Sequence, residues 1–158
     1  MAPRINLPAS PLGAKVSRHF YAASLALMQG TTLPKATQDL VMLRASQLNG
    51  CGYCTDMHSK DLAHSGEPSV RINLVAAWRE STVFTDAERA ALELTEQGTR
   101  IADGAGGVTD EAWENAAKHY DEEELAALTL IISLINAANR MGVITRMPGG
   151  DYQPGQAG

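Results

Sequence analysis

Two cysteines and a histidine carry the clearest chemical pattern in this sequence, within NGCGYCTDMH at residues 49–58. Cys51, Cys54 and His58 are spaced by three and four residues, so on a helix they lie on one face. The free N–H groups of a first helical turn favour negative charge, which stabilises a thiolate. His58 is one turn beyond Cys54 and can exchange a proton with it. The pattern predicts a reactive thiol with a second thiol beside it.

An acidic residue on the preceding segment is placed to act on His58. KATQDLVMLRASQL, about residues 35–48, has helical periodicity and ends at Asn49-Gly50, a pair suited to the positive backbone angles of a helix C-terminus. If the chain folds back there, Asp39 and His58 lie about 15 Å and 14 Å from the turn, nearly level with each other. We therefore expect Asp39 to orient the imidazole.

The elements that must position these residues are predicted to be helices throughout, so the fold class is all-α. Apolar residues recur every three or four positions, and no convincing run of alternating β-branched residues is present. Thr85 with Glu88, and Asp121 with Glu124, are capping-box patterns that mark two helix starts. The helix after Asp121 is apolar nearly all round, which is typical of the centre of a bundle or of a subunit contact.

The sequence indicates a single domain over residues 1–158, with six or seven helices around the long apolar one. Residues 1–12 contain three prolines and are expected to form an extended arm. Residues 147–158 have too little apolar content to order themselves, so we expect a flexible tail.

Composition and charge argue against several classes of partner. The formal net charge is −5 and no Lys/Arg cluster is present, which argues against nucleic acid. The N-terminal residues lack the features of a secretory signal, so we expect a cytoplasmic protein. The apolar stretch at 125–138 is shorter than the roughly 20 residues of a membrane span, so we expect no membrane partner. In a reducing compartment, a cysteine pair is more typical of catalysis or metal binding than of a structural disulfide.

The segment LVMLRASQLNGCGYCTDMH, residues 40–58, resembles the signature of the alkylhydroperoxidase D (AhpD) and carboxymuconolactone decarboxylase family, in its cysteine-bearing branch. FTDAERAALELTE and LINAANR extend the resemblance to about residues 20–145. The resemblance implies an all-helical AhpD-like bundle that forms a homo-oligomer, usually a trimer or a hexamer. It also implies a thiol peroxidase that uses an external dithiol or protein thiol as reductant, without a cofactor or a metal.

Carried over by motif position, the resemblance assigns a role to each residue of the pattern. Cys54 matches the thiol that attacks the hydroperoxide, and Cys51 matches the resolving thiol that forms the disulfide. His58 matches the relay histidine. Asp39 stands where the family usually has glutamate, which is one methylene longer, and Tyr53 stands where some members have a second histidine.

Three other interpretations of the cysteine pair stay open. A general thiol-disulfide oxidoreductase would need the same residues. A structural zinc site would use Cys51, Cys54 and His58 with His64 as a fourth ligand, although such sites usually draw ligands from two separated pairs. A helical binding protein would hold both cysteines as inert buried side chains. The decarboxylase branch of the family generally lacks the cysteine pair.

Overall fold

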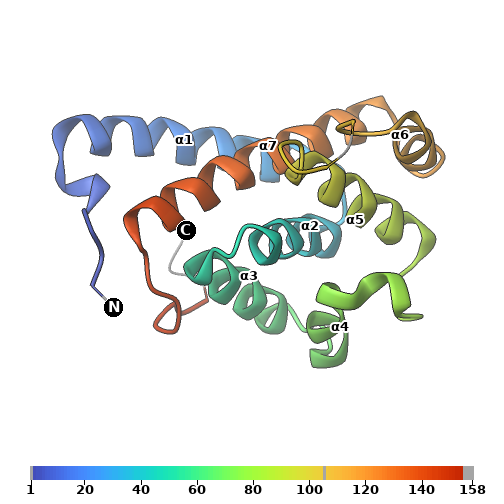
Figure 1. Cartoon of the computed structure of the whole chain (residues 1–158), viewed down its shortest axis with the longest axis horizontal. Coiled ribbons are helices and arrows are strands. Elements are labelled where there is room, and N and C mark those ends of the chain that lie inside the picture. Colours follow the sequence, from blue (N-terminus) through green and yellow to red (C-terminus); the bar gives the residue numbers. More distant parts are fainter. Residues whose placement is uncertain (1, 105, 155–158) are drawn as a thin grey trace.

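The computed structural model describes residues 2–104 and 106–154, which form seven α-helices and no strands (Figure 1). The all-α prediction is confirmed. The helices are α1 (Pro11–Gly30), α2 (Lys35–Leu48), α3 (Gly52–His64), α4 (Ser69–Leu74), α5 (Asp86–Thr99), α6 (Asp110–Ala117) and α7 (Glu122–Thr145). Two short 3-10 helices, η1 (Leu7–Ala9) and η2 (Val75–Glu80), precede α1 and follow α4.

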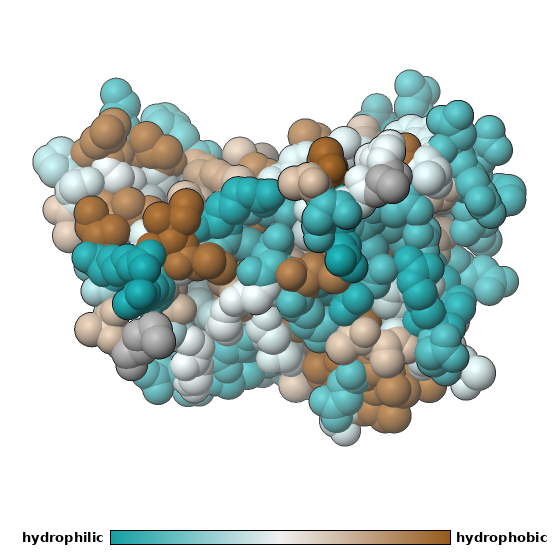
Figure 2. Space-filling view, in the orientation of Figure 1, coloured by the Kyte–Doolittle hydropathy of each residue, from teal (hydrophilic) through white to brown (hydrophobic). Residues whose placement is uncertain are grey.

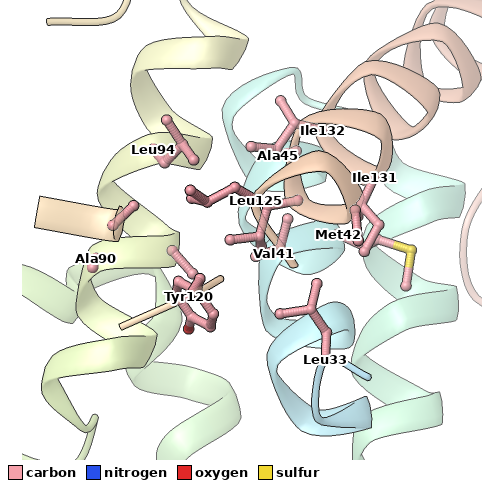
Figure 3. Close-up of a cluster of buried hydrophobic side chains, with 14 of the residues drawn as sticks. Leu33, Val41, Met42, Ala45, Ala90, Leu94, Tyr120, Leu125, Ile131 and Ile132 are labelled. Atoms are coloured by element: carbon pink, nitrogen blue, oxygen red, sulfur yellow. The ribbon is translucent and has the colours of Figure 1, made fainter. Parts of the chain in front are cut away.

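Helix α2 is the buried centre of the molecule and packs against α3, α5 and α7. Its side chains from Thr37 to Leu43, with Ala45 and Ser46, are buried. Figure 3 shows Val41 of α2 beside Leu125 of α7, on the side that faces Leu94 of α5, and Met42 beside Ile131. A second apolar cluster lies on the other side, where α2 meets α3, η2 and α5, and comprises Leu40, Leu43, Leu62, Val75, Trp78, Phe84 and Leu92. Because each fully buried aliphatic side chain contributes about 1.5–3 kcal/mol, α2 is held firmly in place.

The capping boxes begin the two helices where the sequence indicates. The Thr85 hydroxyl accepts from the Glu88 N–H, and the Glu88 carboxylate accepts from the Thr85 N–H, so α5 starts at Asp86. Asp121 and Glu124 do the same at the start of α7. The chain between α3 and α5 forms α4 and then η2, and within η2 the backbone at Ala77 leaves the helical region at φ −124°.

Helix α7 extends beyond the apolar stretch at 125–138. Its length is therefore sufficient for a membrane span, and the expectation that the stretch is too short is corrected. The helix has 24 residues with a mean hydropathy of 1.5 in its most apolar part, which by length and composition alone could cross a bilayer. It packs against α2 and α5, however, and buries the polar side chains of Asn136 and Asn139, as a central helix of a globular bundle does. Within the chain only 39% of that apolar part is buried.

Both chain ends differ from the expectation of an extended arm and a flexible tail. The extended arm stops before η1, and α1 begins at Pro11 with Ser10 as its N-cap. Proline suits a first helical turn because its missing N–H needs no partner there. Of the expected tail, residues 147–154 are described and fold back along α3, whereas residues 155–158 lie outside the described residues.

Candidate redox site

The hairpin between α2 and α3 is closed by Asn49 and Gly50. Asn49 caps α2, and Gly50 has a φ of +65°, a left-handed value that glycine adopts without a Cβ clash. The Asn49 side chain donates to Asn136 Oδ1 at 3.0 Å and to Asn139 Oδ1 at 2.9 Å. These two bonds tie the turn to α7, so the start of α3 is fixed by the helix packed beside it.

Cys51 and Cys54 are joined as a disulfide at the start of α3. Cys51 is the N-cap residue, and its Sγ accepts from the Cys54 N–H at 3.3 Å. The exposed fractions are 1% for Cys51 and 4% for Cys54, so the bond lies inside the protein. The helix N-terminus favours negative charge on either sulfur, and the dipole therefore does not by itself decide which thiol reacts first.

Helix α7 passes directly over the disulfide at Gly142. A Cβ atom added to Gly142 would lie 2.9 Å from Cys51 Sγ and 3.6 Å from Cys54 Sγ. The close approach therefore requires a residue without a side chain at this position. No local pattern marks this contact, because Gly142 lies 91 and 88 positions after the two cysteines.

His58 lies one turn beyond Cys54 on the same helix and is buried, with 5% of its surface exposed. In the described residues its Nε2 atom has no hydrogen-bond partner. Burial lowers the pKa of His58 to about 4, and the positive charge of Lys35 adds to the effect. The imidazole is therefore neutral at pH 7 and can accept a proton. A buried nitrogen without a hydrogen-bond partner is unfavourable. When the disulfide is reduced, the thiol of Cys54 can donate a hydrogen bond to the imidazole.

Asp39 is buried on α2, and its carboxylate is held by the Lys35 ammonium, which contacts both oxygens. Burial raises the pKa of Asp39, the bond and charge of Lys35 oppose that rise, and the negative charge of Asp61 adds to it. No hydrogen bond joins Asp39 to His58 in the part of the chain that the structure describes. The expected role of Asp39 in orienting His58 stays a prediction. Lys35 was not among the predicted site residues, although its place four residues before Asp39 is a helical spacing that indicates a contact between them.

The outer face of α3 is covered by the C-terminal segment. Asp56 accepts from the N–H groups of Gly150 and Tyr152 at 2.7 and 3.3 Å, and Lys60 donates to the carbonyl oxygens of the same two residues at 2.8 and 3.0 Å. The Tyr152 ring is buried and meets the Tyr53 ring edge-on, with centroids 6.5 Å apart. Tyr53 therefore contacts the tail, on a different face of α3 from Cys54.

The residues of the zinc interpretation are not assembled as a metal site. Among the described residues, no group of three or more His, Cys, Asp or Glu side chains could hold a metal ion. Both sulfurs are in the disulfide, and His64 is exposed at the end of α3. A cavity of about 590 Å³ between η2, α5 and α6 is lined by none of the motif residues.

Comparison with known proteins agrees with this arrangement. The carboxymuconolactone decarboxylase family model matches residues 14–97, slightly more than half of the chain and the part that contains the cysteine motif. The chain belongs to this family. The resemblance identified from residues 40–58 is confirmed at the level of the family.

Three relatives show how far the similarity extends. The uncharacterized protein YdfG of Bacillus subtilis is 40% identical over 113 residues, which cover 72% of this chain and 76% of YdfG. The uncharacterized protein YnjA of Escherichia coli is 32% identical over 116 residues, which cover 73% of this chain and 62% of YnjA. The crystal structure of ATU0492 from Agrobacterium tumefaciens, a protein of unknown function provisionally assigned to antioxidant defence as AhpD, is 36% identical. It superposes with a TM-score of 0.87 over 96% of this chain and 100% of that one, so the AhpD-like bundle is confirmed.

Proposed function

We propose that this protein is a thiol peroxidase that reduces hydroperoxides with Cys54 and Cys51. The observation that carries the proposal is the disulfide at the start of α3, one turn from a buried imidazole whose Nε2 has no partner in the described residues. Family membership and the AhpD-like fold support a redox role for this pair. A structural disulfide alone would not require a neutral base one turn away.

The first half of the reaction oxidises Cys54. The neutral imidazole of His58 takes the proton of the reduced Cys54 thiol. The thiolate attacks the terminal oxygen of the hydroperoxide, the O–O bond breaks, and Cys54 becomes a sulfenic acid. His58 returns its proton to the leaving alkoxide, which departs as an alcohol. Asp39 acts in this step by orienting and charge-stabilising the imidazolium.

The second half forms the disulfide that the structure contains. The Cys51 sulfur attacks the Cys54 sulfur, and the hydroxide displaced from the sulfenic acid leaves as water with the Cys51 proton. An external dithiol or protein thiol then donates two electrons and two protons and restores both thiols. No cofactor or metal takes part in this scheme.

The burial of the disulfide bears on which reagents can use it. Because Cys51 and Cys54 are only 1% and 4% exposed, a small hydroperoxide or a small dithiol can reach their sulfurs with less rearrangement of the chain than a protein partner can. Exchange with the disulfide of a folded protein needs in-line access to one sulfur by a bulky partner. The burial therefore favours a small dithiol over a protein thiol as the reductant, and by the same argument it favours the peroxidase over a general thiol-disulfide oxidoreductase that acts on folded proteins. A cytoplasmic location, with thiol reductants present, is part of the same proposal.

A homo-oligomer is part of the proposal because α1 and the end of α7 expose apolar side chains. No residue of α1 is buried within the described chain, although Leu12, Val16 and Leu25 are apolar. Ile144 of α7 is 65% exposed at the end where α1 begins. Figure 2 shows apolar residues gathered at that end of the molecule. A contiguous apolar surface of this kind is typical of a subunit contact, and we propose that a second copy covers it.

A single-turnover oxidation tests the function. The reduced protein is given a substoichiometric pulse of cumene hydroperoxide, and the intact mass and free thiols are measured. We expect the loss of two hydrogens and of both thiols. Cys54→Ser should abolish the reaction, Cys51→Ser should stop at a trapped sulfenic acid, and His58→Gln should slow it by about 10²–10⁴-fold.

The two cysteine variants serve as matched controls for each other, because each removes one sulfur from the same turn. Exchanged phenotypes would reverse the roles of Cys51 and Cys54. Thiols that stay unreacted in folded, reduced wild-type protein would exclude the peroxidase.

A further inference from the structure

Lys35 is a residue of this site to which the proposed mechanism gives no role. It is the first residue of α2, its side chain is 56% exposed, and its ammonium reaches inward to both carboxylate oxygens of Asp39, whose side chain is 2% exposed. Lys35 therefore forms a cap between solvent and a buried acid.

The stability of α2 does not explain this pair. A cation at a helix N-terminus opposes the macrodipole, and a lysine that precedes its acid by four residues is in the less favourable order. An ion pair with one half-exposed member contributes little to stability. The buried Asp39 carboxylate nevertheless needs a partner to stay ionised, and in the disulfide state that partner is Lys35.

The charges around His58 make it a second candidate partner for Asp39. His58 and Asp39 are nearly level on packed helices, and the ammonium of Lys35 acts electrostatically on both side chains. Asp61 of α3 also acts on Asp39, and the Asp61 carboxylate is bound by the Tyr152 hydroxyl at 2.8 Å. Among the described residues, neither α4 nor α7 contributes a charge to these interactions. Lys35 is thus the cation that holds the carboxylate in the disulfide form, and His58, once protonated, is the other cation on the helix packed against Asp39.

We propose that Lys35 is a positioning residue that holds the Asp39 carboxylate while the disulfide is intact and releases it to His58 when Cys54 is a thiol. The inference rests on the proposed function, since it describes the relay of that reaction. In the disulfide, the sulfurs carry no proton, so His58 stays neutral and needs no counter-charge. After reduction, the Cys54 proton moves to His58, and Asp39 exchanges the ammonium for the imidazolium. Lys35, at the surface, is then solvated by water.

The titration of His58 in the disulfide form tests the competition without any peroxide. We expect Lys35→Met to raise the pKa of His58 by about 1–3 pH units, measured from its ring resonances by NMR, because the carboxylate is freed and the lysine charge is gone. Adding Asp39→Asn should lower that value again by about 1 unit or more, because the carboxylate causes most of the rise. Lys35→Arg should keep the wild-type titration.

Lys60→Met is the matched control. Lys60 also pairs with an aspartate four residues away, Asp56, but from the opposite face of the helix that carries His58. It should change the stability of the tail contact and leave the His58 titration unchanged. A His58 titration that is the same in Lys35→Met as in wild type would overturn the proposal. So would a rise that persists in full without Asp39.

A second measurement needs no variant. When the wild-type disulfide is reduced, the carboxyl ¹³C resonance of Asp39 should shift as its partner changes, while that of Asp56, which is also bound by a lysine, should not. An Asp39 resonance that does not respond to reduction would contradict the exchange. Failure of the peroxidase assay would leave both NMR results intact, so the two proposals can fail separately.

Discussion

His58 is a buried neutral base, and this makes the stability of the protein depend on pH. Its pKa is about 4 in the folded state and 6.5 ordinarily. Between these values the unfolded chain binds more protons than the native protein, so the native state is favoured above pH 6.5 and loses stability as the pH falls toward 4. The loss should amount to about 3 kcal/mol.

Denaturant unfolding at a series of pH values measures this loss. The raised pKa of Asp39 acts in the opposite direction, because an acid whose pKa is higher in the folded protein than in the unfolded chain lowers the stability as the pH rises. Comparison with His58→Gln isolates the histidine, because Asp39 and Lys35 are present in both proteins. Parallel pH profiles for wild type and His58→Gln would mean that His58 titrates normally in the folded protein.

At the residue scale, the sequence was informative where neighbours in the site are also neighbours in the chain. Cys51, Cys54 and His58 lie on one helix, so their spacing was enough to bring them together. Gly142 and Tyr152 reach the site only through the tertiary fold, and no local pattern marks them. Asp39 lies in the intermediate case. The length of the hairpin predicted that Asp39 lies level with His58, but it did not predict that Lys35 binds the Asp39 carboxylate.

At the scale of elements, the approach of α7 to α3 is the contact on which the disulfide depends most directly. Gly142→Ala would place a methyl group 2.9 Å from Cys51 Sγ, and neither a disulfide in a helical turn nor the backbone of α7 can move far. We expect a loss of about 1–3 kcal/mol in the free energy of unfolding of the oxidised protein. The loss should be smaller in the reduced protein, whose sulfurs can rotate apart.

Gly30→Ala is the control for this substitution. Gly30 is the last residue of α1, and a Cβ atom there would meet nothing within 4 Å. Alanine should be neutral or stabilising by about 0.5–1 kcal/mol, because it loses less conformational freedom than glycine. If both variants have the same stability in both redox states, α7 does not constrain the cysteine pair.

Helix boundaries were predictable where the sequence contains a capping box, as at Thr85 and Asp121. The docking of residues 149–152 on α3 could not be predicted, because this segment is held mainly by hydrogen bonds between its backbone and the side chains of Asp56 and Lys60. Backbone groups are the same in every sequence, and a composition poor in apolar residues therefore suggested a flexible tail. The single buried ring of Tyr152 was too small a signal to reverse that prediction.

At the scale of the whole molecule, the exposed apolar end formed by α1 and α7 predicts self-association. Leu12 is 73% and Ile144 is 65% exposed, and light scattering after size exclusion should give a multiple of 16.8 kDa. Leu12→Glu combined with Ile144→Glu should lower that mass, because burying two unpaired charges in a contact is strongly unfavourable. Val70→Glu is the control, since Val70 is 53% exposed on α4, a helix that lies apart from α1 and α7 in Figure 1. A monomeric wild type would remove the oligomer from the proposal, and dissociation by Val70→Glu alone would move the contact to α4.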